Sequence, residues 1–426
     1  MPRATSLPVT VLLTALVALG PISTDLYLPS LPAMARAFGA PVGEVQLTLS
    51  VFLAGFATAQ LAYGPLSDRF GRRPILLIGL GIYVAASLAC ALAPSIGVLI
   101  AARFLQAVGG CAGPVLCRAV VRDVHGREGA ARVLAYLSSA VALAPALGPI
   151  LGGFLEVWSG WRANLLVLVA YGASGLAAAA LILPETNPSP DATAMHPRRM
   201  LANYAGLLGR RTYLGYALCC TFAYSGIFAF ISGSSFVLVD RIGLRPDEYG
   251  FCFAAVACSY MAGALAAGRL TRRMGIDRMV RAGGAITGVG GAIPAAVGWS
   301  GAAPNGLGGA AAIIAPMMLC IAGIGLVLPN AMAGAIGPFP RIAGAASALL
   351  GFMQMTTAAM IGVAVGHLHD GTERPMTTAI AAAVLLIPAT YFGLIRPAGR
   401  TAVMSGSGSA AGEPAPAAPP AACRYR

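Results

Sequence analysis

Residues 64–74 read GPLSDRFGRRP and lie between two apolar stretches near the start of the chain. A weaker copy, GRLTRRMG, occupies residues 268–275. When the two copies are aligned, their first and last glycines coincide, whereas Asp68 falls opposite Arg272. The repeat indicates a duplicated chain whose halves share a scaffold but differ in a charged group.

The composition is that of a protein surrounded by lipid. Hydrophobic residues make up 58% of the chain and charged residues 10%, whereas about a quarter of the residues of a soluble domain are charged. A membrane-spanning helix needs roughly 20 apolar residues. Such stretches predict an all-α membrane protein with twelve transmembrane helices in two pseudo-symmetric six-helix bundles. The predicted spans are 8–28, 44–63, 74–93, 96–117, 133–155, 163–183, 212–238, 249–268, 279–299, 307–329, 344–366 and 376–396.

Composition also divides the chain into segments. Residues 1–183 form the predicted N-terminal bundle and residues 212–396 the C-terminal bundle. Residues 184–211 contain several prolines and arginines, so they are too polar for lipid and are predicted to be a cytoplasmic linker. Residues 397–426, rich in Ser, Gly, Pro and Ala, lack the apolar residues needed for folding and are predicted to be a disordered cytoplasmic tail.

The placement of arginine predicts the orientation. All 28 basic residues are Arg, and 22 of them fall on the inner side if the N-terminus is inside, against five on the outer side. Because basic residues are retained on the cytoplasmic side during insertion, both termini are expected in the cytoplasm. The arginines are dispersed among short loops, so we do not expect nucleic acid as a partner.

Two ionisable residues lie away from the ends of the predicted spans, Asp25 in the first and Arg103 in the fourth. Counted at 1.5 Å per residue, both fall in the outer half of the membrane, within about 5 Å of each other in depth. A carboxyl group that alternates between wet and closed surroundings can take up and release a proton. A static ion pair between two helices is the alternative, and the residues alone leave both open.

The predicted fifth span contains APALGPILGG at residues 144–153. Its two prolines remove helix hydrogen bonds, and its glycines allow a neighbouring helix to approach closely. The segment is therefore expected to be bent and tightly packed. A purely structural kink is the simpler interpretation of this pattern taken by itself.

No cluster of residues indicates catalysis. The four histidines all lie in predicted loops, and no nucleophile–base pair, nucleotide-binding loop or metal cluster is recognisable. We therefore expect neither an enzyme nor an ATP-driven pump, and neither a metal nor a cofactor.

The motifs together resemble the major facilitator superfamily, and within it the drug:proton antiporters of the Bcr/CflA type. Residues 64–73 match the superfamily's motif between spans two and three. Residues 103–110, with Arg103, Gln106 and Gly110, are similar to its span-four signature. Residues 148–153 are similar to the span-five signature of exporters, and residues 24–32 to the first span of the Bcr/CflA type.

This resemblance implies a proton-coupled antiporter that exports drugs or other small amphipathic molecules by alternating access. Asp25 would bind the proton and Arg103 would modulate it. The protein would be a monomer in a bacterial inner membrane, with protons, drug-like molecules and lipid as its partners. A proton-coupled importer of a small nutrient on the same fold remains the alternative. The gating kink would comprise Pro145, Gly148, Pro149, Gly152 and Gly153.

The resemblance further implies that residues 64–73 form a conformational latch. Asp68 would lie against an inner helix end and loop arginines in one conformation and separate from them in the other. A simple topology signal of positive charge would not explain an aspartate among arginines. Because Arg272 replaces Asp68 in the second copy, the latch is assigned to the first half. Its residues would be Gly64, Asp68, Arg69, Gly71, Arg72 and Arg73.

Substrate contacts are harder to predict, because aromatic and Met side chains in a cavity resemble those used in helix packing. The absence of a second deep carboxylate fits neutral or weakly charged amphipathic molecules better than dications. The candidate cavity residues are Tyr27, Gln106, Tyr224, Phe228, Met353 and Gln354.

Overall fold

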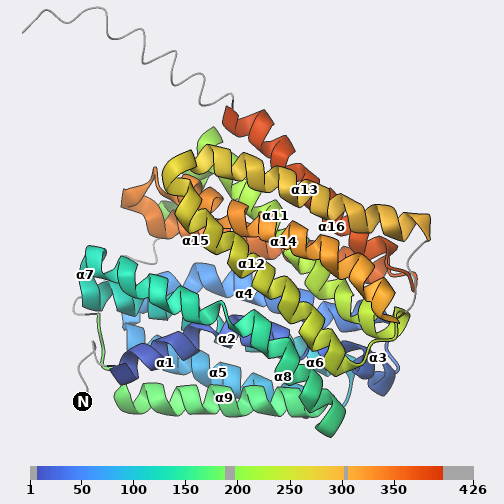
Figure 1. The fold of residues 1–426 in the computed structure, drawn as a ribbon. Coiled ribbons are helices and arrows are strands. Elements are labelled where there is room, and N and C mark those ends of the chain that lie inside the picture. Colours follow the sequence, from blue (N-terminus) through green and yellow to red (C-terminus); the bar gives the residue numbers. More distant parts are fainter. Residues whose placement is uncertain (1–6, 188–196, 302–305, 397–426) are drawn as a thin grey trace, which may run out of the picture.

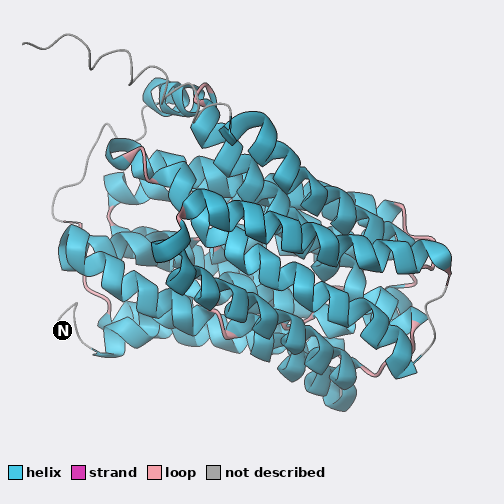
Figure 2. Ribbon diagram, turned by 45° about the horizontal axis from the view of Figure 1, so that its top comes forward, coloured by secondary structure: helices cyan, strands magenta, loops and turns pink. Residues whose placement is uncertain are grey.

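A computed structural model describes residues 7–187, 197–301 and 306–396. Within these ranges the chain is helical and contains no strand, as Figure 2 shows. In the described part of the chain, ten helices are long and apolar enough to cross a membrane, and a pair bent by 42° would make an eleventh. The predicted all-helical membrane fold is confirmed. The predicted fifth span falls on the end of one helix and on a separate helix of 16 residues, Ala144–Ser159.

The first half of the chain begins with a broken helix, followed by long antiparallel helices (Figure 1). Its elements are α1 (Leu7–Val17), α2 (Leu19–Asp25), η1 (Leu28–Ser30), α3 (Leu31–Phe38), α4 (Val42–Phe70), α5 (Arg72–Ala91), α6 (Ile96–Gly110), α7 (Ala112–Val141), α8 (Ala144–Ser159) and α9 (Trp161–Ile182). The fourth span runs through α6 into α7, from Ile96 to His125.

The second half follows α10 (Pro197–Leu208), a helix inside the predicted linker. Its elements are α11 (Arg211–Ser235), η2 (Phe236–Arg241), α12 (Pro246–Met274), α13 (Ile276–Ser300), α14 (Gly306–Ile336), η3 (Pro340–Ile342), α15 (Ala343–His367), α16 (Arg374–Thr390) and η4 (Tyr391–Ile395). The predicted tail, 397–426, and part of the linker, 188–196, lie outside the described residues.

Prolines explain why the first span is broken. A proline lacks the N–H that would bond the carbonyl four residues earlier, and its ring clashes with that carbonyl. Pro21 stands four residues after Val17, where α1 ends, and Pro29 stands four residues after Asp25, where α2 ends. The seven-residue helix α2 therefore ends at the buried aspartate. The prediction of one span over 8–28 missed this division and the continuation to Phe38.

The repeated motif forms a helix end with a one-residue junction, although the predicted spans, 44–63 and 74–93, left residues 64–73 between two helices. α4 extends through Phe70 and α5 starts at Arg72, so only Gly71 separates them. Its φ of +98° is readily adopted only by glycine. In the second half Gly275, at φ +80°, separates α12 from α13 in the same way. The two copies of the motif thus share their backbone geometry.

Helices of the two halves pack against each other mainly in two pairs, α4 with α15 and α8 with α12. In Figure 1, α12 and α15 lie between the first-half helices and α13. Gly250 of α12 permits this contact, because a Cβ there would lie 2.6 Å from the carbonyl oxygen of Pro149. A Cβ on Gly153 of α8 would lie 2.4 Å from the carbonyl oxygen of Pro246. The halves therefore meet backbone to backbone near the start of α12.

The other face of α8 packs on α2 beside the buried aspartate. A Cβ added to Gly148 would lie 3.2 Å from Cβ of Asp25, and one on Gly152 would lie 1.7 Å from the carbonyl oxygen of Leu26. The span-five glycines thus fit α8 between α2 and α12.

The two ends of the molecule differ. At the end that carries Arg72, which we call the arginine-rich end, a cavity of about 550 Å³ separates the middle of α10 and the beginning of α15 from α4 and α7. At the opposite end the halves touch, and Nη1 of Arg36 lies 2.9 Å from Oδ1 of Asp240. The structure is therefore closed at the opposite end and hollow at the arginine-rich end.

Gly152→Ala is expected to lower the stability of the fold by about 3 kcal/mol, because the new methyl group would overlap the backbone carbonyl of Leu26 and force the main chain to shift. Thermal unfolding of the purified protein in detergent measures the effect. Gly97→Ala is the control, since a Cβ there meets no atom within 4 Å. Equal melting temperatures for the two variants would contradict the close packing of α8 on α2.

Candidate functional site

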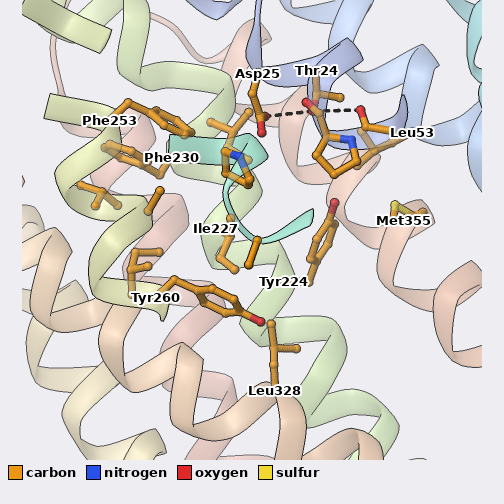
Figure 3. Close-up of a pocket in the computed structure, with 18 of the residues that line it drawn as sticks. Thr24, Asp25, Leu53, Tyr224, Ile227, Phe230, Phe253, Tyr260, Leu328 and Met355 are labelled. Atoms are coloured by element: carbon orange, nitrogen blue, oxygen red, sulfur yellow. Dashed lines mark hydrogen bonds between the residues drawn. The ribbon is translucent and has the colours of Figure 1, made fainter. Parts of the chain in front are cut away.

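A cavity of about 380 Å³ lies between the two halves, deep in the molecule. Its walls come from α2, α4 and the start of α8 in the first half, and from α11, α12, α14 and α15 in the second. Aromatic and aliphatic side chains form most of the surface, and Figure 3 shows several of them around Asp25 and Thr24. The shape and chemistry suit a mainly apolar molecule.

Asp25 is the one carboxylate or cation among the described residues that line this cavity. The residue is 4% exposed. The hydroxyl of Thr24 lies 2.9 Å both from Oδ1 of Asp25 and from the carbonyl oxygen of Pro21. Across the cavity, Tyr224 and Tyr260 contribute the polar groups of the second half (Figure 3). A carboxyl group so placed can meet both a bound molecule and water that enters the cavity.

Arg103 is fully buried but does not pair with Asp25, since no ion pair joins them among the described residues. Its guanidinium carbon lies 4.3 Å from the ring centre of Tyr27 and 4.4 Å from that of Phe52. Nε of Arg103 lies 3.5 Å from the carbonyl oxygen of Thr48. The cation is thus enclosed by two aromatic faces, an arrangement favourable for guanidinium.

A chain of hydrogen bonds extends from Arg103 across three helices. Arg103 donates from Nη1 to Oε1 of Gln106, and Nε2 of Gln106 donates to Oγ of Ser87 at 2.8 Å. One turn before Ser87, the hydroxyl of Tyr83 lies 2.7 Å from Oγ of Ser23. Ser23 and Tyr27 lie two residues before and after Asp25. Arg103 and its partners therefore contact the segment that bears the carboxylate on the side away from the cavity, whereas the carboxylate itself lines the cavity.

The 64–73 motif forms a network within the first half. Arg72 lies between two carboxylates: Nη1 is 2.5 Å from Oδ1 of Asp68, and Nε is 2.9 Å from Oδ2 of Asp123 on α7. Arg72 also donates to Oγ of Ser67 at 2.6 Å. Asp68 lines the 550 Å³ cavity, so it stands at the boundary with the second half.

Glu185, just beyond α9, caps the start of α5. Its Oε1 accepts hydrogen bonds from the backbone N–H groups of Arg72, Thr186 and Asn187, and its Oε2 accepts one from the N–H of Arg73. Partial burial by itself would raise the pKa of Glu185, but these four bonds hold that pKa below its usual range. The ionised form of Glu185 therefore stabilises the folded state, and this stabilisation is lost as the pH falls through the lowered pKa.

The other motif residues have separate surroundings. The guanidinium of Arg69 lies over the ring of Phe70, 5.1 Å from its centre, and Nη2 of Arg73 donates to the carbonyl oxygen of Ala180. A Cβ on Gly71 would lie 2.7 Å from Oε2 of Glu185, whereas a Cβ on Gly64 would meet no atom within 4 Å. Gly64 is thus not required sterically in this conformation.

The sequence of the chain matches a family model over residues 13–363, and the description of that model is Major Facilitator Superfamily. The chain belongs to the Major Facilitator Superfamily. Members of this superfamily are transporters, and the helical spans agree with a multi-pass membrane protein.

Relatives place the chain further within the superfamily. Multidrug resistance protein D of Escherichia coli is 31% identical over 83% of this chain and 87% of its own length. A bicyclomycin resistance protein homolog of Haemophilus influenzae is 29% identical over 88% and 93%. These relatives confirm the resemblance to the Bcr/CflA type. The crystal structure of a D-xylose-proton symporter has the same fold, with a TM-score of 0.70, 14% identity and coverage of 91% of this chain and 97% of that one.

The structure of this superfamily member distributes the six candidate cavity residues differently. Tyr224 lines the cavity. Tyr27 and Gln106 contact Arg103, and Gln354 donates to the carbonyl oxygen of Cys220 at 3.4 Å. Phe228 packs where Gly362 leaves room, and Met353 is partly buried beside the core. The remaining aromatic and Met residues of the cavity wall were missed: Phe52, Phe56, Phe230, Phe253, Tyr260 and Met355.

Other polar residues were also missed by the motif comparison. Asp123 and Glu185 hold the motif, but each lies far from it in sequence. A signal existed for Glu185, because it is an isolated carboxylate directly after a long apolar span. Ser87 gave no comparable signal, since a serine inside a span is common in membrane helices.

Glu185→Gln is expected to destabilise the superfamily fold by about 1–3 kcal/mol, because an amide nitrogen cannot accept a hydrogen bond from the backbone at the start of α5. The melting temperature in detergent at neutral pH measures this. Glu44→Gln, at an exposed position in the first turn of α4, serves as the control. The difference from wild type should shrink as the pH falls below the usual carboxyl range, and a difference independent of pH would contradict the assigned role.

Proposed function

We propose that this protein is a proton-coupled antiporter that exports drugs or other small amphipathic molecules from the cytoplasm of a bacterium. The single observation that carries the proposal is that Asp25 is the one carboxylate among the described residues in the apolar wall of a cavity between the two halves. The names of the relatives, which include drug resistance proteins, support the substrate class.

The coupling follows from the cost of a charge in apolar surroundings. An ionised carboxylate there is unfavourable unless water or a cation compensates it. A proton on Asp25 removes the charge when the cavity is closed, and water that enters an open cavity can remove the proton. The bound molecule and the proton compete for the ionised carboxylate, so binding of one releases the other, and export of the molecule is coupled to proton entry.

Helix α8 is the path by which this event reaches the second half. Gly148 of α8 packs on Asp25 itself, and Gly153 of the same helix packs on the start of α12. A shift of α2 on protonation therefore moves a helix that contacts the other half directly. In this proposal Arg103 is a positioning residue, because it holds the segment around Asp25 through Tyr27 and the Ser87 chain and makes no ion pair with Asp25.

The arginine-rich end is assigned to the cytoplasm, with both termini on that side, on the basis of the arginine distribution. The structure then corresponds to the state open toward the cytoplasm. Closing this end brings Asp68 toward the N-terminal turn of α15, whose first residues line the same cavity. A carboxylate at a helix N-terminus is favourable, so Asp68 would act as the latch of the closed state.

Expression in a pump-deficient bacterium tests the proposed function. Tolerance to a panel of amphipathic antibiotics and dyes should rise, and an uncoupler that collapses the proton gradient should abolish the gain. Accumulation of a panel compound inside the cells, driven by the same gradient, would instead indicate an importer.

Asp25→Asn is expected to abolish proton-driven export, because asparagine cannot take up or release the proton. Transport of a compound from the panel into inside-out vesicles, driven by an imposed pH gradient, measures the loss. Asp25→Glu keeps a titratable group and should retain part of the activity. If Asp25→Asn transports at the wild-type rate under the gradient, the proton site lies elsewhere.

Asp68→Asn is expected to slow turnover by about two- to fivefold, the effect of removing a charge worth 0.3–1 kcal/mol at a helix N-terminus. The same compounds should compete for transport with unchanged relative potency, because Asp68 is not in the wall of the deep cavity. Arg272→Gln, at the aligned position of the second half, is the control and should leave the rate unchanged. Altered competition in Asp68→Asn would indicate a binding role in place of a latch.

A further inference from the structure

The 550 Å³ cavity at the arginine-rich end carries positive charge that the described residues do not neutralise. Its charged lining residues are Asp68, Arg72, Arg118 and Arg122. Arg72 is compensated by Asp68 and by Asp123. Arg118 and Arg122 take part in no ion pair within the described part of the chain, and both side chains are exposed toward this space.

The two arginines lie one turn apart on α7, so their side chains project from the same face. Nε of Arg118 donates to the carbonyl oxygen of Pro114 at 2.7 Å. This bond orients the guanidinium group and leaves its two Nη atoms to donate to another acceptor. Two like charges at this spacing disfavour each other unless an anion lies between them.

The opposite wall of this cavity also has a positive electrostatic potential. It contains Ala343, Gly344 and Ala345, the first residues of the 25-residue helix α15. The N-terminus of a helix presents free N–H groups and the positive end of the helix dipole. A Cβ on Gly344 would meet no atom within 4 Å, so this helix end is open to the cavity. Asn203 and Tyr204 of α10 add neutral polar groups at the side.

We propose that this cavity binds an anion that carries a phosphate group, held between Arg118 and Arg122 of the first half and the N-terminal turn of α15 in the second half. Guanidinium groups match phosphate oxygens in pairs, and helix N-termini bind phosphate through backbone N–H groups. The cavity is much larger than a phosphate ion, so it has room for an attached group. Both a soluble phosphate compound and an anionic lipid headgroup have this chemistry.

Such an anion would bridge the two halves in the state that is open at the arginine-rich end. A ligand that binds one state better shifts the equilibrium toward it. The site lies apart from the deep cavity and from Asp25, so it is a binding site additional to the one proposed for transported molecules.

Thermal unfolding of the delipidated protein in detergent tests the site. Inorganic phosphate and glycerol phosphate are titrated at constant ionic strength set with sodium chloride. In a second arm the protein is placed in nanodiscs of phosphatidylcholine with or without phosphatidylglycerol. Stabilisation by the soluble compounds alone identifies a soluble ligand, and stabilisation by phosphatidylglycerol alone identifies a lipid.

The double variant Arg118→Gln/Arg122→Gln should weaken the response by about tenfold or more in apparent Kd, since it removes both charge-assisted contacts. Arg122→Gln alone, at an exposed position with no partner in the described structure, should weaken it less and protects the test against misfolding of the double variant. Arg269→Gln/Arg273→Gln is the matched control, because these exposed arginines have the same spacing on α12 but do not line the cavity.

Two results would overturn the proposal. One is the absence of stabilisation of the wild-type protein in both arms. The other is an equal loss of response in the Arg118/Arg122 and Arg269/Arg273 variants, which would show that the arginines act only through the general positive charge of this end. Neither result depends on whether the protein exports drugs.

Discussion

The close fit of α8 between α2 and α12 is the contact on which the rest of the arrangement depends. Glycines remove the side chains that would otherwise separate these helices, so backbone atoms meet directly on both faces of α8. Such contacts cannot adjust by changing a rotamer, and α8 must move together with its neighbours. The buried carboxylate, the wall of the deep cavity and the interface between the halves are therefore mechanically joined at one helix.

The sequence predicted the broad arrangement well, because the relevant signals are local. Apolar length identified the helices, and the repeat placed equivalent glycine junctions at Gly71 and Gly275. The rarity of ionisable residues within the apolar spans singled out Asp25 and Arg103, and both are buried. It did not predict that they face different surroundings. Pro21 breaks the first span before Asp25, so the direction of the side chain cannot be counted from the start of the span.

The cavity wall was less predictable. Tyr224 and Phe228 are one turn apart on α11, yet only Tyr224 lines the cavity, where Phe230 also contributes. α11 packs against α14, α15 and α16, so apolar residues occupy every face and periodicity carries little information. The role of Glu185 depends on contacts with residues more than a hundred positions away, which a single sequence does not encode locally.

Pro29 has a consequence for the main chain beside the carboxyl group. Because it supplies no N–H, the carbonyl oxygen of Asp25 lacks the donor that a continuous helix would provide. A backbone acceptor inside a membrane protein is costly unless water or another polar group reaches it. Hydration is thus favoured at Asp25 by the peptide unit as well as by the side chain. A substitution of Pro29 that restored the N–H would reduce hydration around Asp25 while leaving its carboxyl group unchanged.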